Sequence, residues 1–142
     1  MNFEISSDPA RLDRAAIHAA LSRMYWCEDI PRDTLDPAID NSLPFAAYTA
    51  AGEQVSFARV ITDKATFAYL CDVYVLESHR GHGLSKRLME AVTAHPELQG
   101  LRRFSLVTRD AHGLYEQFGF TPIAAPQGHM EILCPGLYMR PV

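Results

Sequence analysis

The sequence predicts an α+β fold: a mixed, mostly antiparallel sheet of about six or seven strands with helices on both faces. Three observations support this fold class. A helical pattern begins the chain, three strand-like runs follow one another in the middle, and strand and helix patterns alternate in the last third. The 142 residues suit one domain, residues 1–142, with a single sizeable core.

Two helices are expected before the first strand. Ser7, Asp8 and Pro9 are typical of a helix N-terminus, with a capping side chain followed by proline in the first turn. A second short helix is expected around residues 32–39. Apolar side chains at helical spacing support the first helix: Ile17, Ala20, Leu21, Met24 and Tyr25.

Three antiparallel strands are expected at residues 43–50, 54–61 and 66–76, which are rich in β-branched and aromatic residues. Short polar turns separate them. The third run is almost entirely apolar around residues 71–76, which is typical of a central strand covered on both faces.

The last third alternates helix and strand. A helix with one apolar side begins at Leu84 and stops at Pro96, and a strand is expected at residues 101–107. A second helix at residues 110–118 ends at Gly119, where Phe120 is placed to make the apolar contact that often follows such a glycine. The final strands are expected at residues 120–124 and 129–133.

Composition narrows the function classes. The net charge is −4, so neither a nucleic-acid-binding surface nor a basic membrane-binding surface is expected. Three isolated cysteines, Cys27, Cys71 and Cys134, form no CxxC pair and predict neither a disulfide framework nor a zinc site. With no signal-peptide pattern at the start, we expect a cytoplasmic protein. The oligomeric state is not fixed, and a homodimer is left open.

Residues 77–83 form a candidate phosphate-binding turn between a strand and a helix. The first amides of a helix lack partners and carry partial positive charge, and glycines allow a phosphate to approach the backbone. Arg80 adds a forked cation. The turn is neither a dinucleotide-binding motif, which would need glycine at Lys86, nor a P-loop. Two glycines and an arginine also occur in turns that bind nothing, so its strand–helix context matters.

Two segments together resemble the GNAT superfamily of N-acetyltransferases. The family's acetyl-CoA signature is Arg or Gln, then Gly three residues later and Gly or Ala two residues after that; here Arg80 and Gly83 match, and Ser85 takes the last place. Residues 111–120, with Leu114-Tyr115 and Gly119-Phe120, are similar to a second family segment. The resemblance covers roughly residues 43–133.

The resemblance implies a GNAT-like three-layer fold and acetyl-CoA as co-substrate, with no metal. It implies that the pantetheine arm pairs with the strand around Val73 and Val75. Thr108 stands where relatives often have an asparagine that binds CoA or orders the helix start. The pyrophosphate is expected on the amides of the turn: Gly81, His82, Gly83, Leu84 and Ser85.

Two residues are candidates for proton transfer. Tyr115 stands where many relatives have a tyrosine near the thioester sulfur, and its phenol could protonate the departing thiolate. The alternative is a packing role on an amphipathic helix. Asp72 could act as base directly, act through water, or brace the sheet, since Cys71 occupies the glutamate position of some relatives. Asp110 is expected to cap the following helix.

The leading functional hypothesis is acetyl transfer from acetyl-CoA to a primary amine of a small molecule. A protein or peptide acceptor, a longer acyl-CoA, and a CoA-binding sensor without turnover are the alternatives. Candidates for the acceptor side are Tyr25, Trp26 and Glu28, with core packing expected for Trp26, and, in the tail, Met130, Glu131 and Tyr138. His79 and His82, without carboxylates, make a poor metal site.

Overall fold

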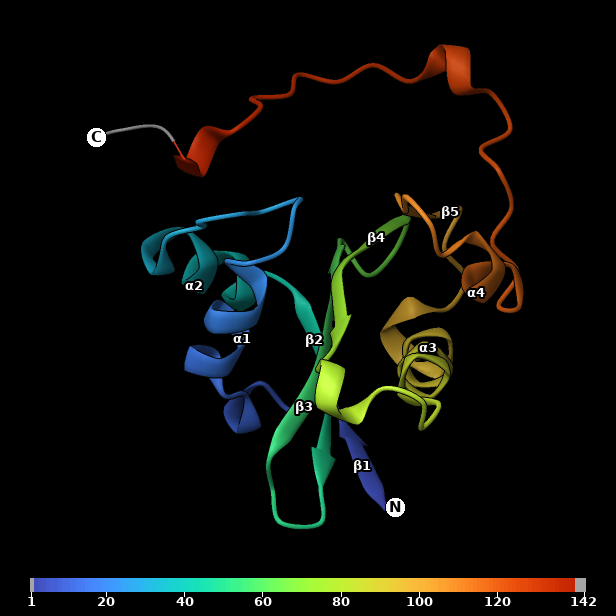
Figure 1. Cartoon of the computed structure of the whole chain (residues 1–142). Coiled ribbons are helices and arrows are strands. Elements are labelled where there is room, and N and C mark those ends of the chain that lie inside the picture. Colours follow the sequence, from blue (N-terminus) through green and yellow to red (C-terminus); the bar gives the residue numbers. More distant parts are fainter. Residues whose placement is uncertain (1, 140–142) are drawn as a thin grey trace.

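The computed structural model describes residues 2–139, and its centre is one five-stranded sheet (Figure 1). The strands lie in the order β1-β2-β3-β4-β5. The pairs β1–β2, β2–β3 and β3–β4 are antiparallel, and the pair β4–β5 is parallel. Their bounds are β1 Phe3–Ser6, β2 Leu43–Thr49, β3 Gln54–Thr62, β4 Phe67–Val75 and β5 Arg103–Leu106.

Helices cover both faces of the sheet, so the predicted α+β class and three layers are confirmed. Figure 1 shows α1 and α2 on one side and α3 and α4 on the other. The α-helices are α1 Arg14–Leu21, α2 Arg32–Asp40, α3 Leu84–Ala94 and α4 His112–Glu116. Short 3-10 turns are η1 Pro9–Arg11, η2 Glu77–His79, η3 Pro96–Leu98, η4 Pro126–Gly128 and η5 Leu137–Met139. No helix within residues 2–139 is both long and apolar enough to cross a bilayer.

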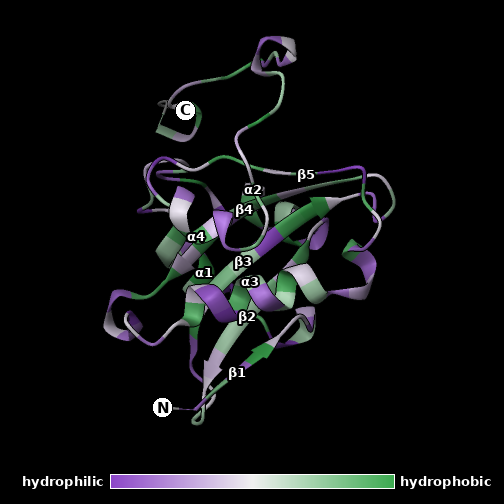
Figure 2. Ribbon diagram, turned by 90° about the vertical axis from the view of Figure 1, so that its right-hand side faces the viewer, coloured by the Kyte–Doolittle hydropathy of each residue, from purple (hydrophilic) through white to green (hydrophobic). Residues whose placement is uncertain are grey.

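Each helical layer builds its own apolar core against the sheet. On one face, Ile17 and Leu21 of α1 pack with Leu35 and Ile39 of α2 and with Phe57 of β3. On the other face, α3 buries a stripe of side chains at helical spacing, Leu84, Leu88, Met89 and Val92. Figure 2 shows α3 in front of the sheet with both hydrophobic and hydrophilic residues along it.

The first helix begins later and ends earlier than the sequence pattern predicts. Pro9 heads the short turn η1, and the carboxylate of Asp13 caps α1 by accepting the N–H of Ala16. Beyond Leu21, turn-type hydrogen bonds such as Met24 N–H to the Leu21 carbonyl replace the helical ones. Met24 and Tyr25 therefore lie in a loop, where they are free to face the sheet's open end.

β4 packs against both helical layers, as expected of a central strand: Ala68 and Leu70 belong to the apolar cluster of α3, and Tyr74 belongs to the cluster of α1 and α2. Alternate side chains, Ala68, Leu70, Asp72 and Tyr74, are buried, and those between them are half-buried apart from the exposed Phe67. The apolar run therefore serves two purposes, because β4 contributes to the core and also lines a pocket from Tyr69 to Val75.

The two final strands at residues 120–124 and 129–133 do not form, so the described sheet has five strands rather than six or seven. Residues 121–137 are all exposed and pair with no strand of their own chain. A strand pattern needs a neighbouring strand to supply its hydrogen bonds, and sequence preference alone does not hold it in place.

Candidate active site

The site lies where β4 and β5 part. β5 pairs with β4 only from Phe67 to Leu70. From Cys71 to Val75, the edge of β4 on that side is left without a strand partner among the described residues. A pocket of about 810 Å³ occupies this opening and runs from the turn before α3 to the loop after α1.

A β-bulge bends β4 at the same point. The pairing register with β3 shifts between Phe57 and Arg59, and Asp72 adopts a left-handed backbone with φ 55°. Bulges bend a strand and redirect side chains, and they occur preferentially beside functional sites. Here the bulge turns the carboxylate of Asp72 toward α1 and leaves Val73 and Val75 lining the pocket.

The turn before α3 has the features expected of a phosphate cradle. Gly81 and Gly83 have φ values of 85° and 72°, a conformation that costs other residues roughly 1–2 kcal/mol. A Cβ on Gly83 would meet no atom within 4 Å, so the surface above it is open. Gly83 precedes α3, and the first backbone amides of α3 have no carbonyl within the helix to donate to. The residues present therefore fit a pyrophosphate.

The side chains beside this turn take separate places. Arg80 donates from Nε to the Val75 carbonyl at 3.3 Å, which ties the turn to the end of β4. His79 and His82 both contact the ring of Phe3, and His82 does not line the pocket. Within residues 2–139, no cluster of three or more metal-binding side chains is found.

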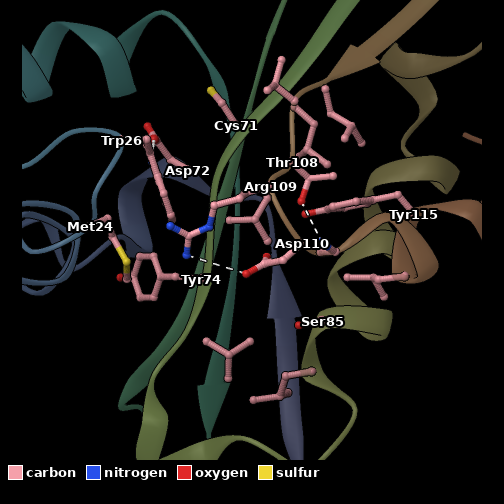
Figure 3. A pocket seen from close by; sticks show the side chains of 18 of the residues that line it. Met24, Trp26, Cys71, Asp72, Tyr74, Ser85, Thr108, Arg109, Asp110 and Tyr115 are labelled. Atoms are coloured by element: carbon pink, nitrogen blue, oxygen red, sulfur yellow. Dashed lines mark hydrogen bonds and ion pairs between the residues drawn. The ribbon is translucent and has the colours of Figure 1, made fainter. Parts of the chain in front are cut away.

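Tyr115 and Thr108 lie on the α4 side of the pocket (Figure 3). Tyr115 is 8% exposed, and burial raises the pKa of its phenol above the ordinary value. Thr108 Oγ1 accepts the Ala111 N–H at 3.0 Å and so holds the start of α4. The expected capping role of Asp110 is wrong, because α4 has Ala111 as its cap residue and receives no side-chain hydrogen bond from Asp110.

Both carboxylate oxygens of Asp72 are already engaged. Trp26 Nε1 donates to Oδ1 at 2.8 Å, and Arg59 Nε donates to Oδ2 at 2.6 Å. Arg59 also donates to Ser42 Oγ at 2.9 Å, so the cluster ties β4 to β3, to the end of α2 and to the loop after α1. Burial opposes the charge on Arg59, but attraction to Asp72 outweighs it and the pKa of Arg59 is raised.

Cys71 lines the pocket beside Asp72, in the position of the glutamate found in some relatives. Burial is the main cause that raises the pKa of its thiol to about 12. The side chain is therefore a neutral thiol at physiological pH and does not serve as a base.

Aromatic side chains and an arginine form the end of the pocket farthest from α3. Met24, Tyr25 and Trp26 line it from the loop after α1, and the Arg109 guanidinium stacks over the Tyr25 ring at 4.0 Å. Figure 3 shows Arg109 between the Trp26–Asp72 side and the Tyr115 side. Trp26 is 43% exposed, so its expected core-packing role is wrong. Glu28 does not line the pocket.

The structure thus brings most of the predicted site residues to one cavity. Sequence reasoning missed Arg59 and Arg109. Arg59 stands among apolar strand residues, where a charge signals a buried partner, whereas no local pattern marks Arg109. The acceptor-side candidates in the tail, Met130, Glu131 and Tyr138, do not line it. The predicted residues that line the cavity are Tyr25, Trp26, Asp72, Val73, Val75, Arg80, Gly81, Gly83, Leu84, Ser85, Thr108 and Tyr115.

Comparisons with known proteins agree with this geometry. Residues 40–122 match the model of the family described as "Acetyltransferase (GNAT) domain". The curated protein "Putative acetyltransferase FG08082" of Gibberella zeae is 35% identical over 136 residues, covering 80% of this chain and 76% of that protein. A predicted acetyltransferase from Clostridium acetobutylicum, solved with acetyl-CoA, is 14% identical with a TM-score of 0.64 over 93% of this chain and 95% of that one, a likeness of fold.

A crystal structure from Xanthomonas campestris pv. campestris, described as a putative acetyltransferase of the GNAT family (XCC2953), is 55% identical. It covers 99% of each chain with a TM-score of 0.95. Residues 119–139 make up about a seventh of this chain, so such a score also requires the tail to follow a similar course in both structures. The matched family model and the curated relative both show that this chain belongs to the GNAT family of acetyltransferases.

Proposed function

We propose that the chain transfers the acetyl group of acetyl-CoA to a primary amine of a small molecule, by direct attack in a ternary complex. One observation carries the proposal: the free edge of β4 from Cys71 to Val75 lies in the same pocket as the N-terminus of α3 and Tyr115. An extended pantetheine arm can add to a free strand edge through backbone hydrogen bonds, as peptides do.

Different residues of the pocket are proposed to bind different parts of acetyl-CoA. Amides from Gly81 to Ser85 would hold the pyrophosphate, aided by the partial positive charge at the start of α3. Backbone groups at Val73 and Val75 would hold the pantetheine arm. A bound acetyl-CoA supplies an already activated thioester, so the remaining task of the protein is to position the amine and to handle protons.

Tyr115 is proposed as the acid. The amine nitrogen forms a bond to the acetyl carbon, the carbon–sulfur bond breaks, and the phenol gives its proton to the leaving sulfur. Because burial keeps the phenol protonated at neutral pH, this proton is available when it is needed. The proton that the attacking amine loses goes to water, since Asp72 has both oxygens engaged and Cys71 is a neutral thiol. Water then returns a proton to the Tyr115 phenolate, which restores the acid for the next turnover.

The acceptor is proposed to enter at the end formed by Met24, Tyr25 and Trp26. Asp72 acts there as a positioning residue, because it fixes Trp26 and hence the acceptor wall. This differs from a direct base in one measurable way: the amine must arrive deprotonated, so kcat/KM should rise with pH toward the pKa of the free amine.

The test is an acetyl-CoA consumption screen over polyamines, arylalkylamines, amino acids, aminoglycosides and short peptides, with free thiol as the readout. Turnover with at least one small amine supports the proposal. Turnover with peptides alone would show that the acceptor is a protein or peptide instead of a small molecule. Saturable acetyl-CoA binding without turnover on any acceptor would instead identify a CoA-binding sensor.

A further inference from the structure

The C-terminal tail, residues 119–139, stands away from the body of the protein. Figure 1 shows it leaving α4, passing beyond the end of the sheet where β4 and β5 lie, and arriving on the side of α1 and α2. Residues 121–137 are exposed without interruption. A folded chain rarely leaves so long a segment uncovered unless something else covers it.

The tail is anchored at both ends, so it is not simply a loose end. At its start, the Phe120 ring packs on Phe104 and Tyr115, at 5.4 and 6.1 Å between ring centroids. His129 Nε2 lies 3.3 Å from Arg103 Nη1 of β5. Near its end, Tyr138 packs against the apolar cluster of α1 and α2. The Xanthomonas campestris relative shares this course, as its score requires.

The unsupported part between these anchors is apolar. Met130 is 96% exposed, Ile132 is 99% exposed and Leu133 is 69% exposed. Met130 and Ile132 alternate with His129 and Glu131, which is the pattern of a half-buried strand. A segment that only crossed solvent would need no apolar side chains. This stretch instead has the pattern of a β-strand without a neighbouring strand.

The sheet of this protein also has a free edge with which such a stretch could pair. β5 is the last strand of the sheet, and its outer edge has no partner among the described residues. Within one chain the tail does not pair with this edge. It contacts β5 where His129 lies beside Arg103, and residues 130–137 are then exposed. The charges are also complementary: Arg102, just before β5, and Arg103, its first residue, are both exposed, and Glu131 lies in the middle of the apolar stretch.

From these observations we infer that the tail docks on a second copy of this chain, where residues 129–134 add as a strand to the outer edge of β5, reciprocally in a two-fold dimer. An identical chain offers both the tail and the open edge, so a two-fold exchange satisfies both at once and closes the assembly. A standard interface involves about 20–30 residues a side, which the tail and its receiving edge together can supply.

The exchange also explains why a strand is predicted at residues 129–133 and does not form in a single chain. The strand pattern at residues 129–133 then has its hydrogen-bonding partner in the second copy. The inference does not depend on the reaction that the enzyme catalyses, and it holds whichever acceptor is used.

The test combines light scattering with amide hydrogen exchange on the full chain. The parent is expected to have twice the 15.9 kDa mass of one chain across the micromolar range. Its amides at residues 129–134 should exchange slowly. The double variant Met130→Asp/Ile132→Asp places two carboxylates in the interface and should give the mass of one chain, with fast exchange at residues 129–134 and unchanged slow exchange in β2 and β3.

A matched control adds the same two carboxylates to the exposed turn beside the strand. The variant Ala125→Asp/Gln127→Asp should remain a dimer. A monomeric parent overturns the inference, as does a double variant that stays dimeric. A parent that is monomeric yet protected at residues 129–134 would show that the tail pairs with its own chain, which also overturns it.

Discussion

Removing the charge of Asp72 should destabilise the fold strongly, and Asp72→Asn isolates that charge. Asparagine tolerates the left-handed backbone at φ 55°, and its amide oxygen can still accept the Trp26 N–H. What is lost is the ion pair with Arg59, whose side chain is 14% exposed, against 8% for Asp72. The substitution thus leaves a buried guanidinium without its carboxylate.

The expected cost follows from that burial. Breaking one partner of a buried ion pair costs about 3–5 kcal/mol, and the retained Trp26 contact places Asp72→Asn near the lower value. For a chain of this size that corresponds to a Tm lower by roughly 10 °C. The double variant Arg59→Met/Asp72→Asn should lose less than the two single losses added together, because it leaves no unpaired buried charge.

The assay is urea unfolding and thermal melting of the parent, both single variants and the double variant. Glu97→Gln is the matched control, because it removes an exposed ion pair with Lys64 and should leave stability unchanged. The reasoning is refuted if Asp72→Asn unfolds within about 1 kcal/mol of the parent, or if the double variant shows no coupling.

Three further outcomes are expected. Tyr115→Phe should lower kcat by roughly 10²-fold or more while the Kd for acetyl-CoA changes little, measured by steady-state kinetics and calorimetry; equal turnover would remove the phenol from the mechanism. Since burial raises the pKa of Tyr115 above its ordinary value of 10.0, the pH profile of the parent should show no loss of kcat from this group below about pH 10. Iodoacetamide at neutral pH should label Cys71 and Cys27 much more slowly than free cysteine, because burial raises the pKa of both thiols to about 12; peptide mapping that finds either residue labelled as fast as free cysteine would contradict this.

Much of the fold was predictable because local patterns and packing agree. The strands β2 and β3 are apolar, aromatic and β-branched runs bounded by short turns, and α3 has apolar residues at helical spacing, so the bounds differ from prediction by only a few residues. Gly119 and Phe120 also behave as their pattern predicts: Gly119 has φ 92°, and Phe120 packs on Tyr115.

The errors arise where the answer depends on a distant part of the chain. The sequence does not show that β4 lines a pocket from Tyr69 to Val75, because only the parting of β5 opens that space. Trp26 lies on the pocket because its indole N–H finds Asp72, 46 positions away in the sequence. The turn at Gly83 was predictable, since strand, glycines and helix are neighbours in sequence, whereas the Asp72 cluster joins four separate segments.

The central claim is that acetyl-CoA binds at the turn before α3, and one comparison tests it most directly. Gly83→Glu puts a carboxylate against the proposed pyrophosphate site. Gly100→Glu is matched to it, because Gly100 has nearly the same backbone, with φ 70°, and lies outside the pocket. Both variants should therefore lose similar stability without ligand, roughly 1–2 kcal/mol.

Acetyl-CoA at 100 times its Kd should stabilise the parent by about 2.7 kcal/mol, which raises Tm by roughly 5–10 °C. The account predicts that Gly100→Glu keeps this rise and that Gly83→Glu loses it. A full rise in Gly83→Glu, or an equal loss in both variants, would contradict the assignment of this turn as the acetyl-CoA site.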